Sequence, residues 1–314
     1  MSAPAATREA YPVALLQLVE QGVDVVAIDA DLSASTGGNL FGEKHPHRWM
    51  TVGVAEQDMV GIAAGLAAAG KTAFIASFAV FLPGRCFDQL RTSVAQPMGG
   101  LNVKAVASHG GVTVGEDGAS AQAIEDLALA TSLISFDVIV PADFEEARQA
   151  ILAVGHTARP AYIRTGRPKV PALFDGSYRF EIGKAHLMRP GTDVTIVACG
   201  IMVGIAVEAA GLLQAEGVSA RVLDMATVKP VDREAVIAAA RETGAIVTAE
   251  EHQTTGGLGT AVARVLAETV PVPMSFVGVD RYGTSGKWDE LLTYFELTPA
   301  RIAQTARDAI ARKR

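Results

Sequence analysis

An acidic residue, Glu56, stands where an extended apolar segment gives way to a helix of small apolar residues, in GVAEQDMVGIAAGLAAAG. A carboxylate in an apolar setting either costs several kcal/mol to keep charged without a partner or holds a proton. We therefore expect another group to contact Glu56. On residue type alone, the alternative is an ordinary helix-start glutamate that the helix dipole stabilises.

Other residues that could take part in chemistry follow the ends of predicted strands. They are Ser35 in DADLSAS, Phe78 and Phe81 in SFAVF, His109 and Asp117 in SHGGVTVGEDG, and Arg164 in AYIRTGR. Because open parallel sheets bind ligands at the carboxyl ends of their strands, we expect these side chains to line one pocket. Each also has a structural alternative, since aromatic rings fill cores and His or Asp residues occupy turns and caps.

The elements that must position these residues alternate between strands and helices. Apolar runs rich in Val and Ile predict strands at 23–30, 48–54, 72–78, 102–108, 137–142 and 160–166. Helical stretches lie between several of them, at 56–70, 84–97, 121–133 and 143–155. Strands of this kind, joined by helices, indicate a largely parallel sheet that is covered on both faces.

A second alternation of strands and helices follows residue 193. Its strands are predicted at 194–200, 219–225, 245–251 and 273–279, and its helices at 202–217, 232–244, 257–268 and 298–314. The stretch 169–193 holds turn clusters without helical periodicity, so we predict a linker there. The expected fold class is α/β, with two doubly wound domains over residues 10–175 and 190–314.

Composition narrows the classes of function. The 314 residues carry a net charge of −7, which argues against a nucleic-acid partner. The chain has two cysteines, Cys86 and Cys199, and no export signal, so we expect a cytoplasmic protein without disulfides. The apolar stretch 59–83 is not expected to enter a membrane, because Lys71 falls in its middle.

Two further patterns carry no predicted chemistry. His45 and His47 have the spacing of metal ligands, but no Cys or further His is near them, so we predict no metal site on this chain. The segment TTGGLGTA, at 254–261, is similar to a phosphate-binding loop but lacks the full glycine spacing. We therefore assign it no chemistry.

Several motifs, taken together and in order, resemble the C-terminal half of the transketolase family. They are GVAEQDMVGIAAGLAAAG, SFAVFLPGRCFDQLR, SHGGVTVGEDGAS with IEDLA, YIRTGR, VLDMATVKPVD and EEHQTTGGLG. The resemblance implies a thiamine pyrimidine-binding domain followed by a transketolase C-terminal domain. The GDG motif of the family's diphosphate-binding domain does not occur in this sequence.

The resemblance therefore implies one subunit of a split transketolase, which transfers a two-carbon ketol unit between sugar phosphates. The implied cofactors are thiamine diphosphate and Mg²⁺. An N-terminal transketolase subunit would hold the diphosphate and the Mg²⁺, in an expected α2β2 heterotetramer. Two other readings stay open: the β subunit of a related 2-oxoacid dehydrogenase or deoxyxylulose-phosphate synthase-like enzyme, and a non-catalytic regulatory subunit with the same fold.

The resemblance also implies roles around the cofactor. The acid at the Glu56 position is catalytic and hydrogen-bonds to N1′ of the aminopyrimidine ring. Phe78 and Phe81 match the aromatic pair against which that ring packs. Arg85 follows on the next helix, where it could orient the ring or form an i, i+3 pair with Asp88.

The substrate residues are implied in the same way. Ser35, His109 and Arg164 match positions that hold the substrate phosphate, and Asp117 matches an acid that binds a substrate hydroxyl group. One departure is Ala121, where most family members carry His or Gln. Because that side chain normally contacts the terminal hydroxyl groups of the donor, the identity of the donor sugar stays open.

Overall fold

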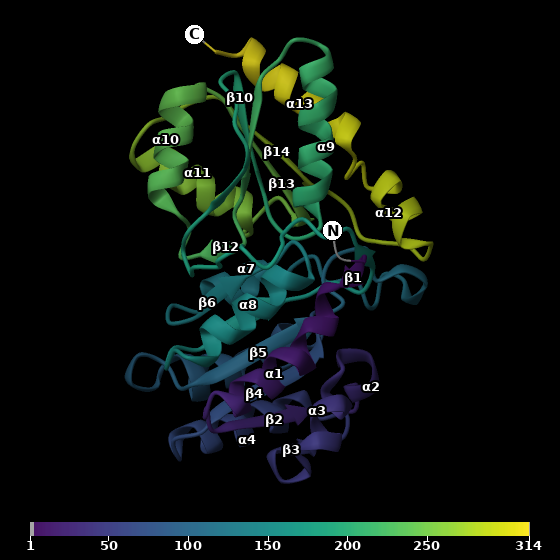
Figure 1. The fold of residues 1–314 in the computed structure, drawn as a ribbon, viewed down its shortest axis with the longest axis vertical. Helices are drawn as coiled ribbons and strands as arrows, with labels where there is room; N and C mark the ends of the chain where they lie inside the picture. The colour runs from purple at the N-terminus through teal and green to yellow at the C-terminus, as the bar shows by residue number, and fades with distance from the viewer. Residues whose placement is uncertain (1–2, 314) are drawn as a thin grey trace.

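A computed structural model describes residues 3–313, and it has two α/β domains stacked one above the other (Figure 1). The first domain contains the strands β1 (Ala5–Ala6), β2 (Val25–Asp29), β3 (Trp49–Thr51), β4 (Thr72–Phe78), β5 (Val103–Ser108), β6 (Asp137–Ile139), β7 (Ala161–Arg164) and β8 (Lys169–Val170). Its helices are α1 (Ala10–Glu20), α2 (Ser33–Thr36), α3 (Gly38–Lys44), α4 (Glu56–Ala68), α5 (Leu82–Arg85), α6 (Phe87–Gln89), α7 (Asp126–Ser132) and α8 (Phe144–Gly155).

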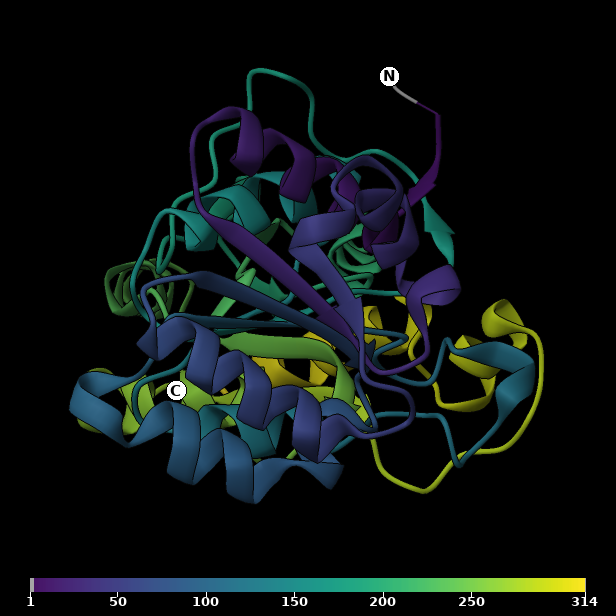
Figure 2. The same cartoon turned by 90° about the horizontal axis from the view of Figure 1, so that it is seen from below.

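The main sheet of the first domain has seven strands in the order β12-β6-β7-β5-β4-β2-β3, where β12 is Thr227–Lys229. All neighbouring strands are parallel except the edge strand β12. Successive residues face opposite sides, so Phe74 packs with α1 and α8 while Ile75 packs with α4 and α7. Figure 2 shows helices on both sides of this sheet. The predicted parallel sheet with two covered faces is confirmed.

The second domain repeats this plan. Its strands are β9 (His186–Arg189), β10 (Val194–Ala198), β11 (Ala220–Asp224), β13 (Ile246–Gln253) and β14 (Met274–Val279). Its helices are α9 (Met202–Ala215), α10 (Arg233–Thr243), α11 (Leu258–Glu268), α12 (Trp288–Tyr294) and α13 (Pro299–Ala311). The sheet order is β14-β13-β10-β11-β9, with α9 and α13 on one face and α10 and α11 on the other.

Three segments differ from the sequence prediction. The stretch 169–193 is not only a linker, because it contains β8, which pairs with β1, and β9, which forms the antiparallel edge of the second sheet. The helix predicted at 84–97 is broken into α5, α6 and a π-helical turn at Leu90–Ala95. The third segment, β12, belongs by sequence to the second domain but completes the sheet of the first.

The two domains share a buried interface. Besides the β12–β6 pairing, the carboxyl group of Glu146 on α8 faces that of Asp224 at the end of β11, and burial raises the pKa of both groups. The hydroxyl group of Tyr178 donates to Glu146 Oε1 over 2.5 Å. Both carboxyl oxygens of Asp224 are buried without a hydrogen-bond partner among the described residues, which disfavours the charged form.

None of the helices within residues 3–313 combines the length and the apolar composition that crossing a bilayer requires.

Candidate active site

Glu56 is the first residue of α4, and its carboxyl group is buried. The helix turns Met59, Val60 and Ala63 toward the core, which draws its first residue inward. Glu56 is only 4% exposed, and its Oε1 accepts a hydrogen bond from Arg85 Nη1 over 3.0 Å. The group that contacts this acid is therefore a guanidinium of the same chain.

Arg85 also lies flat against an aromatic ring. Its Cζ atom is 3.9 Å from the centroid of the Phe81 ring, a cation–π distance. The Phe81 ring stacks in turn on Phe78, with centroids 5.9 Å apart and planes inclined by 17°. Within residues 3–313, the alternative of an Arg85–Asp88 pair is not formed, and the guanidinium bonds to Glu56.

The contacts continue from Phe78 to His109 at the end of β5. Their rings stack with centroids 3.9 Å apart. His109 has a φ of +59°, its Nδ1 lies 2.9 Å from Ser108 Oγ, and its Nε2 lies 3.3 Å from Arg8 Nη1. The same Arg8 nitrogen donates to the carbonyl oxygen of Ser35 over 2.8 Å. Six predicted residues, from Glu56 to Ser35, therefore lie in one continuous series of contacts, which Arg8 completes.

The charge in this part of the site comes from arginines. Burial, together with the nearby cations Arg8 and Arg167, lowers the pKa of His109 to about 3, so the ring is neutral at pH 7. Arg167 also lowers the pKa of the half-buried Arg8, after burial itself. Arg167 also pairs with the exposed Glu116, since its Nη1 lies 3.1 Å from Glu116 Oε2. Arg8 and Arg167, beside the neutral His109, suit an anion such as a phosphate.

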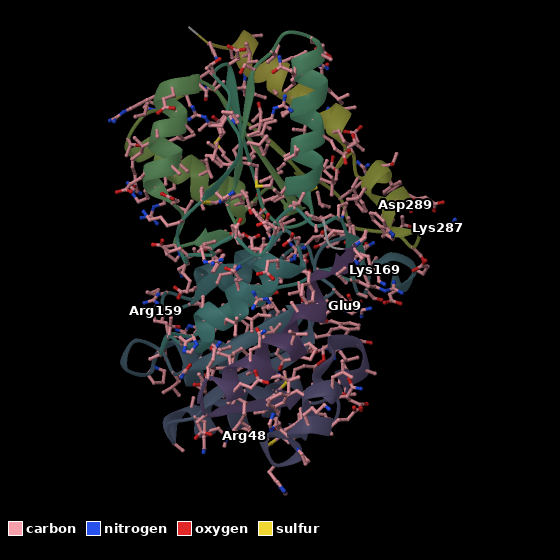
Figure 3. The ribbon with its side chains drawn as sticks, viewed as in Figure 1. Glu9, Arg48, Arg159, Lys169, Lys287 and Asp289 are labelled. Carbon is pink, nitrogen blue, oxygen red and sulfur yellow. The ribbon has the colours of Figure 1, made fainter. Side chains whose placement is uncertain are left out.

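Arg8 and Arg167 are residues that the sequence analysis missed. Arg8 lies ahead of α1, far in sequence from the strand ends. Arg167 stands three residues after Arg164 in the quoted motif YIRTGR, so that motif could have indicated it. In Figure 3, their chain neighbours Glu9 and Lys169 lie on the same side of the view as Lys287.

Arg164, Asp117 and Ala121 lie outside this series of contacts. Arg164 is 3% exposed, and its Nε lies 3.3 Å from Asp126 Oδ2, so the cation is paired inside the fold. Asp117 is exposed at the end of a short 3₁₀ turn, Gly115–Asp117. Ala121 is buried. The direct substrate contacts of Arg164 and Asp117 stay predictions.

The surroundings of Glu56 fit a flat heterocycle with ring nitrogens. The guanidinium of Arg85, a planar group with N–H donors, lies over the Phe81 ring and bonds to Glu56. A flat heterocycle that bonds to Glu56 would need the same shape and polarity. The Arg85 side chain is 48% exposed, so it has room to move aside. Within the described part of the chain, no three His, Cys, Asp or Glu side chains form a group that could hold a metal ion.

Comparison with protein families gives two matches in chain order. The transketolase pyrimidine-binding domain matches residues 3–172. The transketolase C-terminal domain matches residues 183–302. Together they span the two sheets described above.

Individual relatives agree with these matches. A 6-deoxy-6-sulfo-D-fructose transketolase subunit from Clostridium sp. (strain MSTE9) is 41% identical over 307 residues, 98% of this chain and 95% of the relative. Human transketolase is 36% identical over 311 residues, 98% of this chain but 49% of the human protein. A solved structure titled "Split gene transketolase, inactive beta4 tetramer" has a TM-score of 0.92 and 46% identity, over 98% of this chain and 99% of that one. This chain therefore belongs to the transketolase family, and it corresponds to that family's pyrimidine-binding and C-terminal domains.

Proposed function

We propose that this chain is the C-terminal subunit of a thiamine diphosphate-dependent transketolase, which transfers a two-carbon ketol unit between sugar phosphates together with a partner subunit. The observation that carries the proposal is the buried Glu56 carboxyl group, which bonds to a planar N–H group lying on the Phe81 ring. Relatives of nearly full length support it, because two are named as subunits of transketolases. The dehydrogenase and regulatory readings left open by the sequence are not favoured by these relatives.

The residues on this side of the site have distinct tasks toward the cofactor. Thiamine diphosphate, when bound, supplies the nucleophilic carbon that carries the ketol unit. Glu56 holds a proton at a ring nitrogen of the aminopyrimidine, and its burial excludes water that would compete for that proton. Phe78 and Phe81 pack against the ring face. Arg85 now lies over the Phe81 ring, and it would move aside and help to orient the cofactor ring.

The substrate phosphate has a separate place beside His109. Arg8 and Arg167 supply the positive charge there, while neutral His109 and the Ser35 segment supply hydrogen bonds. Asp117 is close by in sequence and binds a hydroxyl group of the substrate.

The small Ala121 removes one hydrogen bond to the end of the donor. This departure fits a donor that differs from the common ketose phosphates. The names of two relatives point the same way, since one acts on 6-deoxy-6-sulfo-D-fructose and the other on apulose 4-phosphate.

The partner is a polypeptide that carries the diphosphate-binding domain and its Mg²⁺ site. The absence of a GDG motif from the sequence supports this, as do two relatives named as transketolase subunits, of which this chain covers 95% and 96%. The solved relative of 46% identity is titled an inactive tetramer of β chains, which fits a requirement for a second kind of chain. We propose an α2β2 assembly.

The test is reconstitution with an N-terminal transketolase subunit, thiamine diphosphate and Mg²⁺. We expect ketol transfer from the mixture and none from this chain alone. Glu56→Ala should lower kcat by about 10²- to 10⁴-fold, as for the loss of an acid–base group. Asp58→Ala is the matched control, because Asp58 is an exposed acid in the same first turn of α4 and should leave kcat unchanged. Turnover that survives Glu56→Ala would contradict the role of this acid.

A further inference from the structure

The second domain reaches beneath the loop that carries the substrate residues. We name residues 109–118 the substrate loop, since it begins at His109 and contains Asp117. Glu251, near the end of β13, is 8% exposed, and its Oε1 accepts a hydrogen bond from the backbone N–H of Thr113 over 2.7 Å. The loop is therefore tied at its middle to a carboxylate of the other domain.

The glycines of the loop allow this close approach. Gly111 has a φ of +76°, and a Cβ atom there would lie 2.1 Å from Cδ of Glu251. At Gly110 a Cβ atom would lie 2.1 Å from Nε of Arg164. The backbone of the loop thus rests directly on the side chains of Glu251 and Arg164, with no space for a side chain of its own.

Arg164 links the backbone of Glu251 to that of Ala123, which pairs with the loop. Its Nη2 donates to the carbonyl oxygen of Glu251 over 2.7 Å and to that of Ala123 over 3.1 Å. Ala123 and Gly111 exchange two backbone hydrogen bonds, of 2.9 and 3.1 Å. This buried cation therefore acts through the backbone beneath the loop.

Packing alone does not fix the height of the loop. A small cavity of about 30 Å³ lies behind it, lined by Thr113, Arg164 and Glu251 among others. That is room for about two water molecules. The hydroxyl groups of Thr113 and Thr165 are buried without a partner among the described residues. Packing around Thr113 is therefore incomplete, so the hydrogen bond from its N–H to Glu251 limits the movement of this part of the loop.

We propose that Glu251 is a positioning residue of the active site, which holds the substrate loop in the position that lets His109 and Asp117 contact the substrate. Glu251 touches neither substrate nor cofactor, and its effect is transmitted through Thr113. Burial raises the pKa of Glu251, while Arg164 and the hydrogen bond from Thr113 oppose that rise. The inference rests on the proposed function, because the substrate is the one named there.

The experiment compares two adjacent buried glutamates in the complex with the partner subunit. Glu251→Ala removes the acceptor for Thr113, whereas the control Glu250→Ala removes the acceptor for the N–H groups of Leu258 and Gly259 at the start of α11. Both changes cost stability. Only Glu251→Ala should raise KM for the phosphorylated donor, by about 5- to 30-fold, with a smaller change in kcat. Glu251→Gln keeps an acceptor oxygen and should restore KM.

Hydrogen exchange on the isolated chain gives a second readout. Glu251→Ala should speed exchange in the peptide that contains Thr113, and Glu250→Ala should speed it around Leu258 instead. An active wild-type complex with equal KM values for the two alanine variants overturns the positioning role. Unchanged exchange at Thr113 in Glu251→Ala also overturns the positioning role. A wild-type complex that shows no ketol transfer would reject only the proposed function.

Discussion

The neutral, buried His109 makes the stability of this chain depend on pH in a way that one substitution should remove. The pKa of His109 falls from its ordinary value of 6.5 to about 3 in the folded chain, mainly through burial. Between these values the unfolded chain binds a proton that the folded chain does not, so the free energy of unfolding falls as the pH falls. From pH 7 to pH 5, this single group should cost about 2 kcal/mol.

His109→Asn isolates that contribution. Asn tolerates the φ of +59° at this position and has no charge to gain in this pH range. Urea unfolding of the isolated chain at pH 5, 6 and 7, followed by circular dichroism, gives the free energy of unfolding for each protein. The variant should lose about 2 kcal/mol less than the wild type between pH 7 and 5.

Two comparisons make this experiment decisive. His47→Asn changes an exposed histidine and should keep the wild-type dependence on pH. Equal slopes for His109→Asn and the wild type would show that His109 is not held neutral, and the assignment of the site's positive charge to arginines would then fail.

Two further predictions concern the arginines of the site. Arg8→Met should raise KM for phosphorylated sugars by about 10- to 100-fold in the reconstituted complex, since a charged hydrogen bond is lost, while Arg233→Met, on the exposed side of α10, should not. Equal effects of Arg8→Met on free and phosphorylated sugars would contradict the phosphate assignment. Arg85→Ala leaves the buried Glu56 carboxyl group without its partner, so urea unfolding should show a loss of about 1 to 2 kcal/mol that largely disappears in a Glu56→Gln background. The same loss in both backgrounds would argue against the ion pair.

Much of the fold could be predicted from the sequence because its strands are buried on both faces. Runs such as 72–78 are mostly apolar and follow a Gly-Lys turn signal, so their positions are visible locally. The edge strands are different. β9 and β12 are short and partly polar, and each becomes a strand only because β11 or β6 offers free backbone groups. Nothing within such segments identifies a partner far away in the chain.

The candidate site could likewise be predicted only in part. The strand-end rule and the family resemblance place Glu56, Phe78 and His109 on one edge, and their contacts agree with that. The same reasoning names Arg164 as a phosphate-binding cation, which stays a prediction, and it does not indicate Arg167. Arg164 ends β7 and turns inward to Asp126, while Arg167 lies past Gly166 at the surface of the site. Which cation is buried depends on a carboxylate that only the folded chain brings near.

The position of β12, at the edge of the first domain's sheet, has a consequence for how this polypeptide could be divided. A cut near residue 180 would give an amino-terminal fragment in which β6 lacks the neighbour that covers its outer edge, and such an open edge invites association with other chains. It would also separate Glu146 from the buried carboxyl group of Asp224, which it faces across the domain interface. The two sheets therefore depend on each other, and we expect both to be encoded in one polypeptide.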